Sequence, residues 1–166
     1  MSVVAVRKEG SKITIGADSI RVSGWFTQEK DKLAKLFVIS KEMVVGAAGN
    51  CSTAALFREF VENHLPKTNT EYGWTMLMRD FANHLSDMKS GPKFEDTNFI
   101  VVYKHKIFFL GGYFIREVRD YYAIGAGMDY ALAALYLGSS VREAVQAACH
   151  LSIFCEEPVN VIELKQ

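Results

Sequence analysis

The chain has 166 residues, of which 49% are apolar and 23% charged, and its formal net charge is zero. Such a chain can bury a core large enough to fold without disulfides or metals, and its balanced charge argues against general binding to nucleic acid or to a membrane surface. It holds no secretory signal and no apolar run near the ~20 residues that span a bilayer. Its odd number of cysteines (Cys51, Cys149 and Cys155) matches no zinc spacing. We therefore expect a single cytoplasmic domain over residues 1–166, with reduced thiols and without metal or cofactor.

The first part of the chain is predicted to consist of strands. Runs of apolar residues predict strands at residues 4–7, 13–15, 35–39 and 43–48, with a short strand and a loop over residues 19–28. Turn-forming residues at 9–11 and 40–42 join neighbouring strands into hairpins.

Two helices are predicted to follow. Asn50 or Ser52 can cap the first, which runs to about Leu65 because Pro66 ends it. The second is predicted over residues 72–90, since a glycine and a proline follow it. Apolar residues at helical spacing predict a buried stripe on each helix: Phe57, Phe60, Val61 and Leu65 on the first, and Trp74, Leu77, Phe81, Leu85 and Met88 on the second.

The second half of the chain repeats this order. Strands are predicted at residues 98–103, 106–110 and 113–118, and a short strand enters a glycine turn over residues 122–127. Asp129 is predicted to cap a helix that ends near Leu137, and Ser140 and Glu143 form a capping box for a last helix to about Phe154. The buried stripe of that helix is predicted to comprise Val141, Ala144, Val145, Ala148 and Leu151. Residues 159–164 are predicted to close the chain as a strand.

This order of elements predicts the fold class. Grouped strands alternating with grouped helices indicate an α+β protein rather than βαβ units, and hairpins indicate antiparallel sheets. Two packed sheets with a helix pair on each outer face would bury every predicted stripe. We therefore predict a four-layer αββα sandwich.

The candidate chemistry lies in the first eighteen residues. The predicted N-terminal hairpin brings Ser2 close to Asp18, at the far end of its second strand. If Met1 is removed, Ser2 carries a hydroxyl and a free α-amine, so that a nucleophile and a base belong to one residue. Asp18 would lie near enough to tune both groups.

These residues, with others along the chain, resemble a known family. Residues 15–19, Ile-Gly-Ala-Asp-Ser, are similar to the corresponding strand of proteasome β subunits, which are N-terminal-nucleophile hydrolases. Lys35-Leu-Phe-Val-Ile and Val45-Gly-Ala-Ala-Gly49 resemble their lysine strand and the glycine strand after it, and Ala123-Ile-Gly-Ala-Gly127 resembles their second-half turn. The closing segment at residues 158–164 also fits. The resemblance covers nearly the whole chain, whose length is closest to the peptidase subunit of the bacterial two-component ATP-dependent protease.

The resemblance implies catalytic roles for four residues. Ser2 would be the nucleophile, with its own α-amine as the base. The Lys35 ammonium would lower the pKa of that amine towards neutral, and Asp18 would hold Lys35 charged and oriented. The Gly46 backbone N–H would be the oxyanion donor. Counting back from Gly46 favours Lys32 as the site lysine instead, whereas the Lys-Leu-Phe string favours Lys35.

The resemblance also implies how a peptide substrate would bind. Val22, Gly46 and Ala48 would pair with an extended peptide through their backbone groups. Val45 would help to shape the pocket for the residue that precedes the cleaved bond.

Two positions depart from the family pattern. Ala126 stands where active members carry a serine that supports the proton network of the amine, and the later acidic position falls on Ser152. These departures leave three functions open. The first is a ring-forming endopeptidase subunit that receives unfolded chains from an ATP-dependent unfoldase. The second is a catalytically inactive subunit with a structural or assembly role, and the third is a small-molecule amidase of the wider class, which would usually carry longer loops. The first two predict self-association into a ring.

Overall fold

The computed structural model describes residues 2–23, 26–30, 35–87 and 96–165. Its strands are β1 (Val4–Glu9), β2 (Lys12–Ala17), β3 (Ile20–Ser23), β4 (Phe26–Lys30), β5 (Leu36–Ser40), β6 (Met43–Gly49), β7 (Thr97–Tyr103), β8 (Lys106–Gly111), β9 (Phe114–Val118), β10 (Tyr121–Ile124) and β11 (Asn160–Lys165). Its helices are α1 (Cys51–Asn63), α2 (Glu71–Ser86), α3 (Met128–Tyr136) and α4 (Val141–Leu151).

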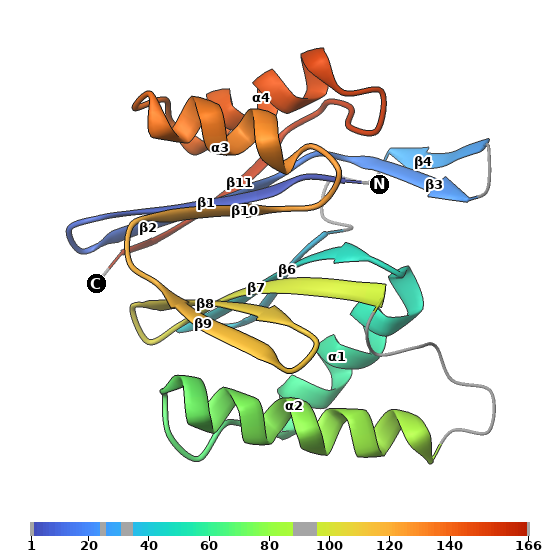
Figure 1. The fold of residues 1–166 in the computed structure, drawn as a ribbon, viewed down its shortest axis with the longest axis vertical. Coiled ribbons are helices and arrows are strands. Elements are labelled where there is room, and N and C mark those ends of the chain that lie inside the picture. The colour runs from blue at the N-terminus through green and yellow to red at the C-terminus, as the bar shows by residue number, and fades with distance from the viewer. Residues whose placement is uncertain (1, 24–25, 31–34, 88–95, 166) are drawn as a thin grey trace.

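These elements form the four layers that the sequence predicts (Figure 1). One sheet has the strand order β10-β1-β2-β11 and the other β5-β6-β7-β8-β9, and all of these pairings are antiparallel. Helices α3 and α4 cover the outer face of the first sheet, and α1 and α2 cover the outer face of the second. The predicted α+β sandwich is therefore confirmed.

The side chains of β1 show why the two sheets pack between helices. Val4 and Val6 face the other sheet, whereas Val3 and Ala5 pack towards α3 and α4, and all four are fully buried. A strand covered on both faces has no polar side, which explains the continuous apolar run.

The two helical layers pack differently. The α3/α4 layer packs on small residues such as Ala144 and Ala148, whereas the α1/α2 layer buries aromatic rings, with the Phe57 and Phe99 centroids 4.2 Å apart.

Among the described residues, no helix has both the length and the apolar character that a membrane span requires.

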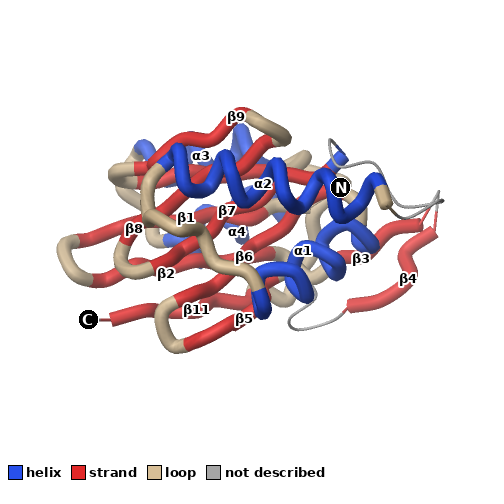
Figure 2. The backbone as a smooth tube through the Cα atoms, turned by 90° about the horizontal axis from the view of Figure 1, so that it is seen from below, coloured by secondary structure: helices blue, strands red, loops and turns tan. Residues whose placement is uncertain are grey.

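A further hairpin lies outside the two main sheets. Strands β3 and β4 pair only with each other among the described residues, and the hairpin projects at the end of the molecule where the chain begins (Figures 1 and 2). The prediction of one short strand followed by a loop over residues 19–28 was wrong, because the second strand, Phe-Thr-Gln-Glu-Lys, lacks the apolar alternation that marks a strand with a buried face.

Helix ends are the other differences. Helix α1 stops at Asn63, two residues early, and Leu65 is 56% exposed rather than buried. Helix α2 starts one residue earlier than predicted, under a Thr70 cap, and ends at Ser86; the predicted core residue Met88 lies outside the described residues. Each predicted end was placed at a proline or glycine, but the chain leaves the helix before that residue.

The second helix pair shows the same kind of error. Helix α3 begins at Met128 after Gly127, so Asp129 lies in the first turn and is not the cap. The capping box of Ser140 and Glu143 is present on α4, but that helix ends at Leu151, which is 63% exposed.

Candidate active site

Asp18 lies at the centre of the candidate site, directly after β2. Its Oδ1 accepts a hydrogen bond from the Val3 backbone N–H at 2.8 Å. Its Oδ2 accepts from the N–H groups of Ile20 at 3.4 Å and Glu156 at 3.3 Å. The residue is 1% exposed. Two segments that are distant in sequence, at Val3 and Glu156, and the adjoining Ile20 therefore fix the position of this carboxylate.

Lys35 is the ionic partner of Asp18. Its Nζ lies 2.5 Å from Asp18 Oδ1, and both side chains are buried. The Lys35 backbone oxygen accepts from the Ala47 N–H at 2.9 Å, which ties the start of β5 to β6. Burial lowers the pKa of Lys35, while the charge and the hydrogen bond of Asp18 act in the opposite direction. The alternative site lysine, Lys32, lies outside the described residues.

Ser2 is held against the turn that follows β10. It is 6% exposed, and its backbone oxygen accepts a hydrogen bond from the Gly127 N–H at 3.1 Å. Gly125, with φ +94°, passes so close that a Cβ there would lie 2.3 Å from this oxygen. The structure thus brings Ser2 from the N-terminus to a turn in the second half of the chain. Met1 lies outside the described residues.

We predict that Gly125→Ala destabilises the protein by about 2–4 kcal/mol and displaces Ser2, because strain from the left-handed backbone adds to the clash with the Ser2 oxygen. Gly138 offers a matched control. It has the same φ of +94°, but nothing lies within 4 Å of a Cβ placed there. Gly138→Ala should therefore lose only about 1–2 kcal/mol, the cost of the backbone conformation. Denaturant unfolding measures both, and equal losses would show that Gly125 does not support Ser2.

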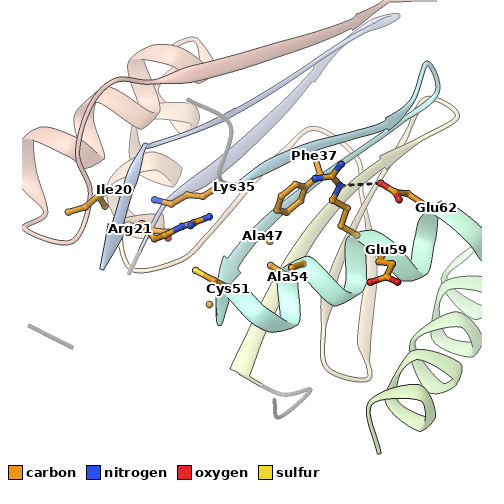
Figure 3. Close-up of a pocket in the computed structure, with 13 residues that line it drawn as sticks. Ile20, Arg21, Lys35, Phe37, Ala47, Cys51, Ala54, Glu59 and Glu62 are labelled. Carbon is orange, nitrogen blue, oxygen red and sulfur yellow. Dashed lines mark hydrogen bonds and ion pairs between the residues drawn. The ribbon is translucent and has the colours of Figure 1, made fainter. Parts of the chain in front are cut away.

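Ser2 and Lys35 line a cavity of about 420 Å³ that runs along α1 (Figure 3). This volume is in the range of binding sites for small ligands or single side chains of a larger ligand. Helix α1 supplies one face of the cavity, at the spacing i, i+3, i+4, i+7, i+8 and i+11: Cys51, Ala54, Ala55, Arg58, Glu59 and Glu62. The remaining lining comes from Ile20, Arg21, Phe37, Ala47 and Gly49.

The structure places the other expected site residues away from this cavity. Gly46 lies between the two sheets, where a Cβ would meet Val4 Cγ1 at 2.6 Å and Ile15 Cδ1 at 3.1 Å. Val45 is fully buried in the layer beneath α1 and α2. The roles expected of Gly46 as oxyanion donor and of Val45 as a pocket residue do not fit these positions.

The direction of the backbone groups in β6 leads to the same conclusion. Ala47 donates to Lys35 on the β5 side, and successive N–H groups of a strand point to opposite sides. The N–H groups of Gly46 and Ala48 therefore face β7, with which β6 pairs over its whole length. The N–H of Gly49 points to the same side as that of Ala47. Gly49, at the end of β6 with φ +141°, lines the cavity.

Val22, the remaining candidate, lies in β3, where its backbone is in register with Thr27 of β4. Its neighbour Arg21 lines the cavity. The start of β3 is thus placed across the cavity from the end of β6.

Of the two positions that depart from the family pattern, Ala126 lies in the turn that holds Ser2. Ala126 is exposed in the turn between Gly125 and Gly127. Ser152 ends α4, where its hydroxyl accepts from the Phe154 N–H at 3.2 Å.

Cys149 and Cys155 pack near the Lys35–Asp18 ion pair. Burial raises the pKa of the Cys149 thiol to about 12 and that of Cys155 to about 11, and the negative charge of Asp18 adds to both shifts. Both thiols are therefore protonated near neutral pH and poorly suited to act as nucleophiles. Within the described residues, no three His, Cys, Asp or Glu side chains are placed to hold a metal ion.

The fold is of the HslV type, a proteasome β-subunit-like fold, which confirms the resemblance seen in the sequence. The structure of BPH from Thiobacillus denitrificans in complex with epoxomicin matches with a TM-score of 0.86 at 18% identity, over 98% of each chain. A second structure of Thiobacillus denitrificans BPH matches with a TM-score of 0.85 at 17% identity, over 98% of this chain and 97% of that one. Eukaryotic HslV from Trypanosoma brucei matches with a TM-score of 0.76 at 19% identity, over 99% of each chain. No protein-family model matches the sequence, and no curated protein is similar to it.

Proposed function

We propose that the chain is a proteasome-like endopeptidase subunit that hydrolyses peptide bonds with Ser2 as its N-terminal nucleophile after removal of Met1. The observation that carries the proposal is the buried pair of Lys35 and Asp18, which lies at the cavity that Ser2 also lines. A buried ion pair costs desolvation free energy, and such pairs are frequent where they serve chemistry. The HslV-type fold supports the same class of reaction.

The proposed reaction begins with attack of Ser2 Oγ on the carbonyl carbon of the scissile peptide bond. The α-amine of Ser2 takes the hydroxyl proton, and the positive charge of Lys35 keeps the pKa of that amine low enough for the amine to be unprotonated. Asp18 keeps Lys35 in place and favours its charged form against the effect of burial. The α-amine of Ser2 then gives the proton to the leaving amine of the cleaved peptide bond. This step leaves an acyl ester on Ser2 Oγ, which water hydrolyses.

Gly49 replaces Gly46 as the proposed oxyanion donor. Its N–H points away from β7, and the residue lines the cavity together with Ser2. A single backbone donor of this kind lowers the barrier by about 3 kcal/mol. Ala47 likewise replaces Val45 as the residue of β6 that shapes the pocket.

We propose that an extended peptide binds between β3 and the end of β6. Val22 would pair with it from one side, and Gly49 from the other, in place of Gly46 and Ala48. The side chain that precedes the cleaved bond would then enter the cavity along α1.

The proposed partners are further copies of the chain, in a ring, and an ATP-dependent unfoldase that supplies unfolded substrates. We place the protein in the cytoplasm, where free cysteines stay reduced; all three cysteines are unpaired in the structure.

Intact mass of the purified protein, with peptide turnover on the same sample, tests the proposal. We expect the mass to lack one methionine and the sample to hydrolyse unstructured peptides. Because Thiobacillus denitrificans BPH was solved with epoxomicin, we also expect epoxomicin to raise the melting temperature of this protein. Retained Met1, no turnover and no shift with epoxomicin would instead support a catalytically inactive subunit, the function that Ala126 and Ser152 favour.

A further inference from the structure

Thr97 is a buried polar residue at the start of β7, beside the end of β6. It is 1% exposed, and its backbone is in register with Gly49, the proposed oxyanion donor. Its Oγ1 accepts a hydrogen bond from the Asn50 N–H at 3.0 Å and donates one to the Asn50 backbone oxygen at 3.4 Å. A single hydroxyl group thus holds the peptide groups on both sides of Asn50.

The direction of the Gly49 N–H depends on the residues on either side of it. Gly49 and Asn50 are both exposed, and a glycine backbone turns more freely than that of any other residue. On the side away from β7, the pairing of β6 extends among the described residues no further than the Ala47 N–H. The neighbours of Gly49 therefore fix its orientation: Ala48 is held in the ladder between β6 and β7, and Asn50 is held by Thr97.

A threonine suits this position better than an apolar residue of the same shape. Strand β7 passes so close to Gly49 that a Cβ there would lie 2.2 Å from the Asp96 oxygen and 2.7 Å from the Thr97 Cα. At this separation the Thr97 hydroxyl reaches the Asn50 backbone, whereas valine would fill the same space without a hydrogen bond. The Asn50 N–H also donates to the Asp96 oxygen at 3.3 Å, so it keeps an acceptor when the hydroxyl is removed. Loss of the hydroxyl should therefore loosen the segment of Gly49 and Asn50 without unfolding the protein.

We propose that Thr97 is a positioning residue for the hydrolysis: through Asn50, its hydroxyl keeps the Gly49 N–H directed at the oxygen that becomes negative in the transition state. This inference rests on the proposed function, in which Gly49 supplies that N–H. A donor stabilises the oxyanion best when it is in place before the reaction, and a hydrogen bond weakens steeply when its angle is distorted. The carbonyl oxygen of a bound peptide carries much less charge and depends less on this donor. Loss of the Thr97 hydroxyl should therefore slow the reaction and leave the affinity for peptides unchanged.

Thr97→Val tests this role with a measurement on the tetrahedral state itself. A peptide aldehyde reacts with Ser2: the bond between Oγ and the aldehyde carbon forms, the carbonyl π bond opens, and the proton of Oγ passes through the α-amine to the carbonyl oxygen. That oxygen then occupies the position of the oxyanion, so the adduct needs the same Gly49 donor as the transition state. In Thr97→Val we expect kcat to fall about tenfold, KM to stay within about twofold, and the aldehyde to bind about tenfold more weakly. The affinity for the product peptide, which forms no adduct, should not change.

Thr97→Ser and Thr53→Val are the matched controls. Serine restores the hydroxyl at residue 97, so Thr97→Ser should keep kcat and aldehyde affinity within about threefold of the wild-type values. Thr53, on α1, is also fully buried, and its N–H, which donates to Asn50 Oδ1, remains in the valine variant. Thr53→Val should lower the melting temperature without changing the ratio of aldehyde affinity to product affinity. Thr97→Ala removes the hydroxyl without a branched side chain and gives a second measurement where valine does not fit.

The outcomes separate this inference from the proposed function. An active wild-type protein whose kcat and aldehyde affinity are unchanged in Thr97→Val and Thr97→Ala would overturn the inference and leave the peptidase activity standing. The inference would also be wrong if Thr53→Val lowered both values as much, or if Thr97→Ser lost as much as Thr97→Val, because either result would show a general loss of packing. A wild-type protein that neither hydrolyses peptides nor binds the aldehyde would contradict the proposed function, and the role of Thr97 with it. Melting temperatures of all variants establish that they are folded.

Discussion

Replacing Ser2 by alanine is expected to reduce kcat/KM for peptide hydrolysis by about 10³-fold or more. The variant removes Oγ, the atom that would form the acyl ester, and leaves the rest of the proposed machinery in place. Its fold should persist, because the Ser2 backbone oxygen, which accepts a hydrogen bond from the Gly127 N–H in the turn after β10, is unchanged in the variant. Initial rates on a fluorogenic peptide, with the melting temperature of the variant, measure the effect.

The control for this prediction is Ser2→Thr. Threonine keeps a hydroxyl and an α-amine on the same residue, so this variant should retain hydrolysis once Met1 is removed. A Ser2→Ala protein that hydrolyses peptides at the wild-type rate would show that the nucleophile lies elsewhere. Intact mass of each variant must accompany the rates, because a retained Met1 would block the amine in all of them.

The layers of the fold could be predicted because the apolar patterns are strong. The fully apolar run from Val3 to Val6 requires cover on both faces, and the stripe of Trp74, Leu77 and Phe81 requires a sheet to pack on. The hairpin of β3 and β4 could not be predicted in the same way, because it lies outside both sheets and is polar along its second strand. Helix ends depend on where the chain must turn. Leu65 therefore continues the apolar periodicity of α1 after that helix has ended, and Leu151 continues that of α4 at the last residue of the helix.

The candidate site could be predicted only in part. Strand pairing alone places Asp18 beside Val3, so the approach of Asp18 to the N-terminus follows from the first hairpin. The sequence of β6 offers Gly46 and Gly49, but it does not show which N–H faces a neighbouring strand; the register with β7 decides this.

The cavity wall was missed for a different reason. The α1 residues that line it recur at helical spacing, but on the face beside the apolar stripe. A search for small residues followed by a charged i, i+4 pair on that face would have found Ala54, Arg58 and Glu62.

Asp18→Asn is expected to lower the free energy of unfolding by about 3–5 kcal/mol at neutral pH. The variant leaves the Lys35 ammonium buried without its counter-ion, and it places an amide where a carboxylate accepts hydrogen bonds from Val3, Ile20 and Glu156. Urea unfolding measures the loss. A loss below about 1 kcal/mol, the value of an exposed pair, would contradict the role given to this buried pair.

The dependence of this loss on pH identifies its cause. Burial lowers the pKa of Lys35 in the folded state, and Asp18→Asn removes the charge that opposes the shift. The unfolded chain then binds more protons than the folded one between the lowered pKa and the ordinary value near 10.5, so stability in this window rises with pH. Asp18→Asn should therefore recover part of its loss as the pH rises towards about 10, more than the wild-type protein gains over the same range.

The double variant Asp18→Asn, Lys35→Met separates stability from chemistry. Methionine has a similar length and no charge, so the buried ammonium is removed and most of the lost stability should return without dependence on pH in this window. Peptide hydrolysis should not return with it, because no cation then lowers the pKa of the Ser2 amine. A double variant that is stable and inactive would show that the pair serves the reaction, whereas one that is stable and active would assign it a structural role alone.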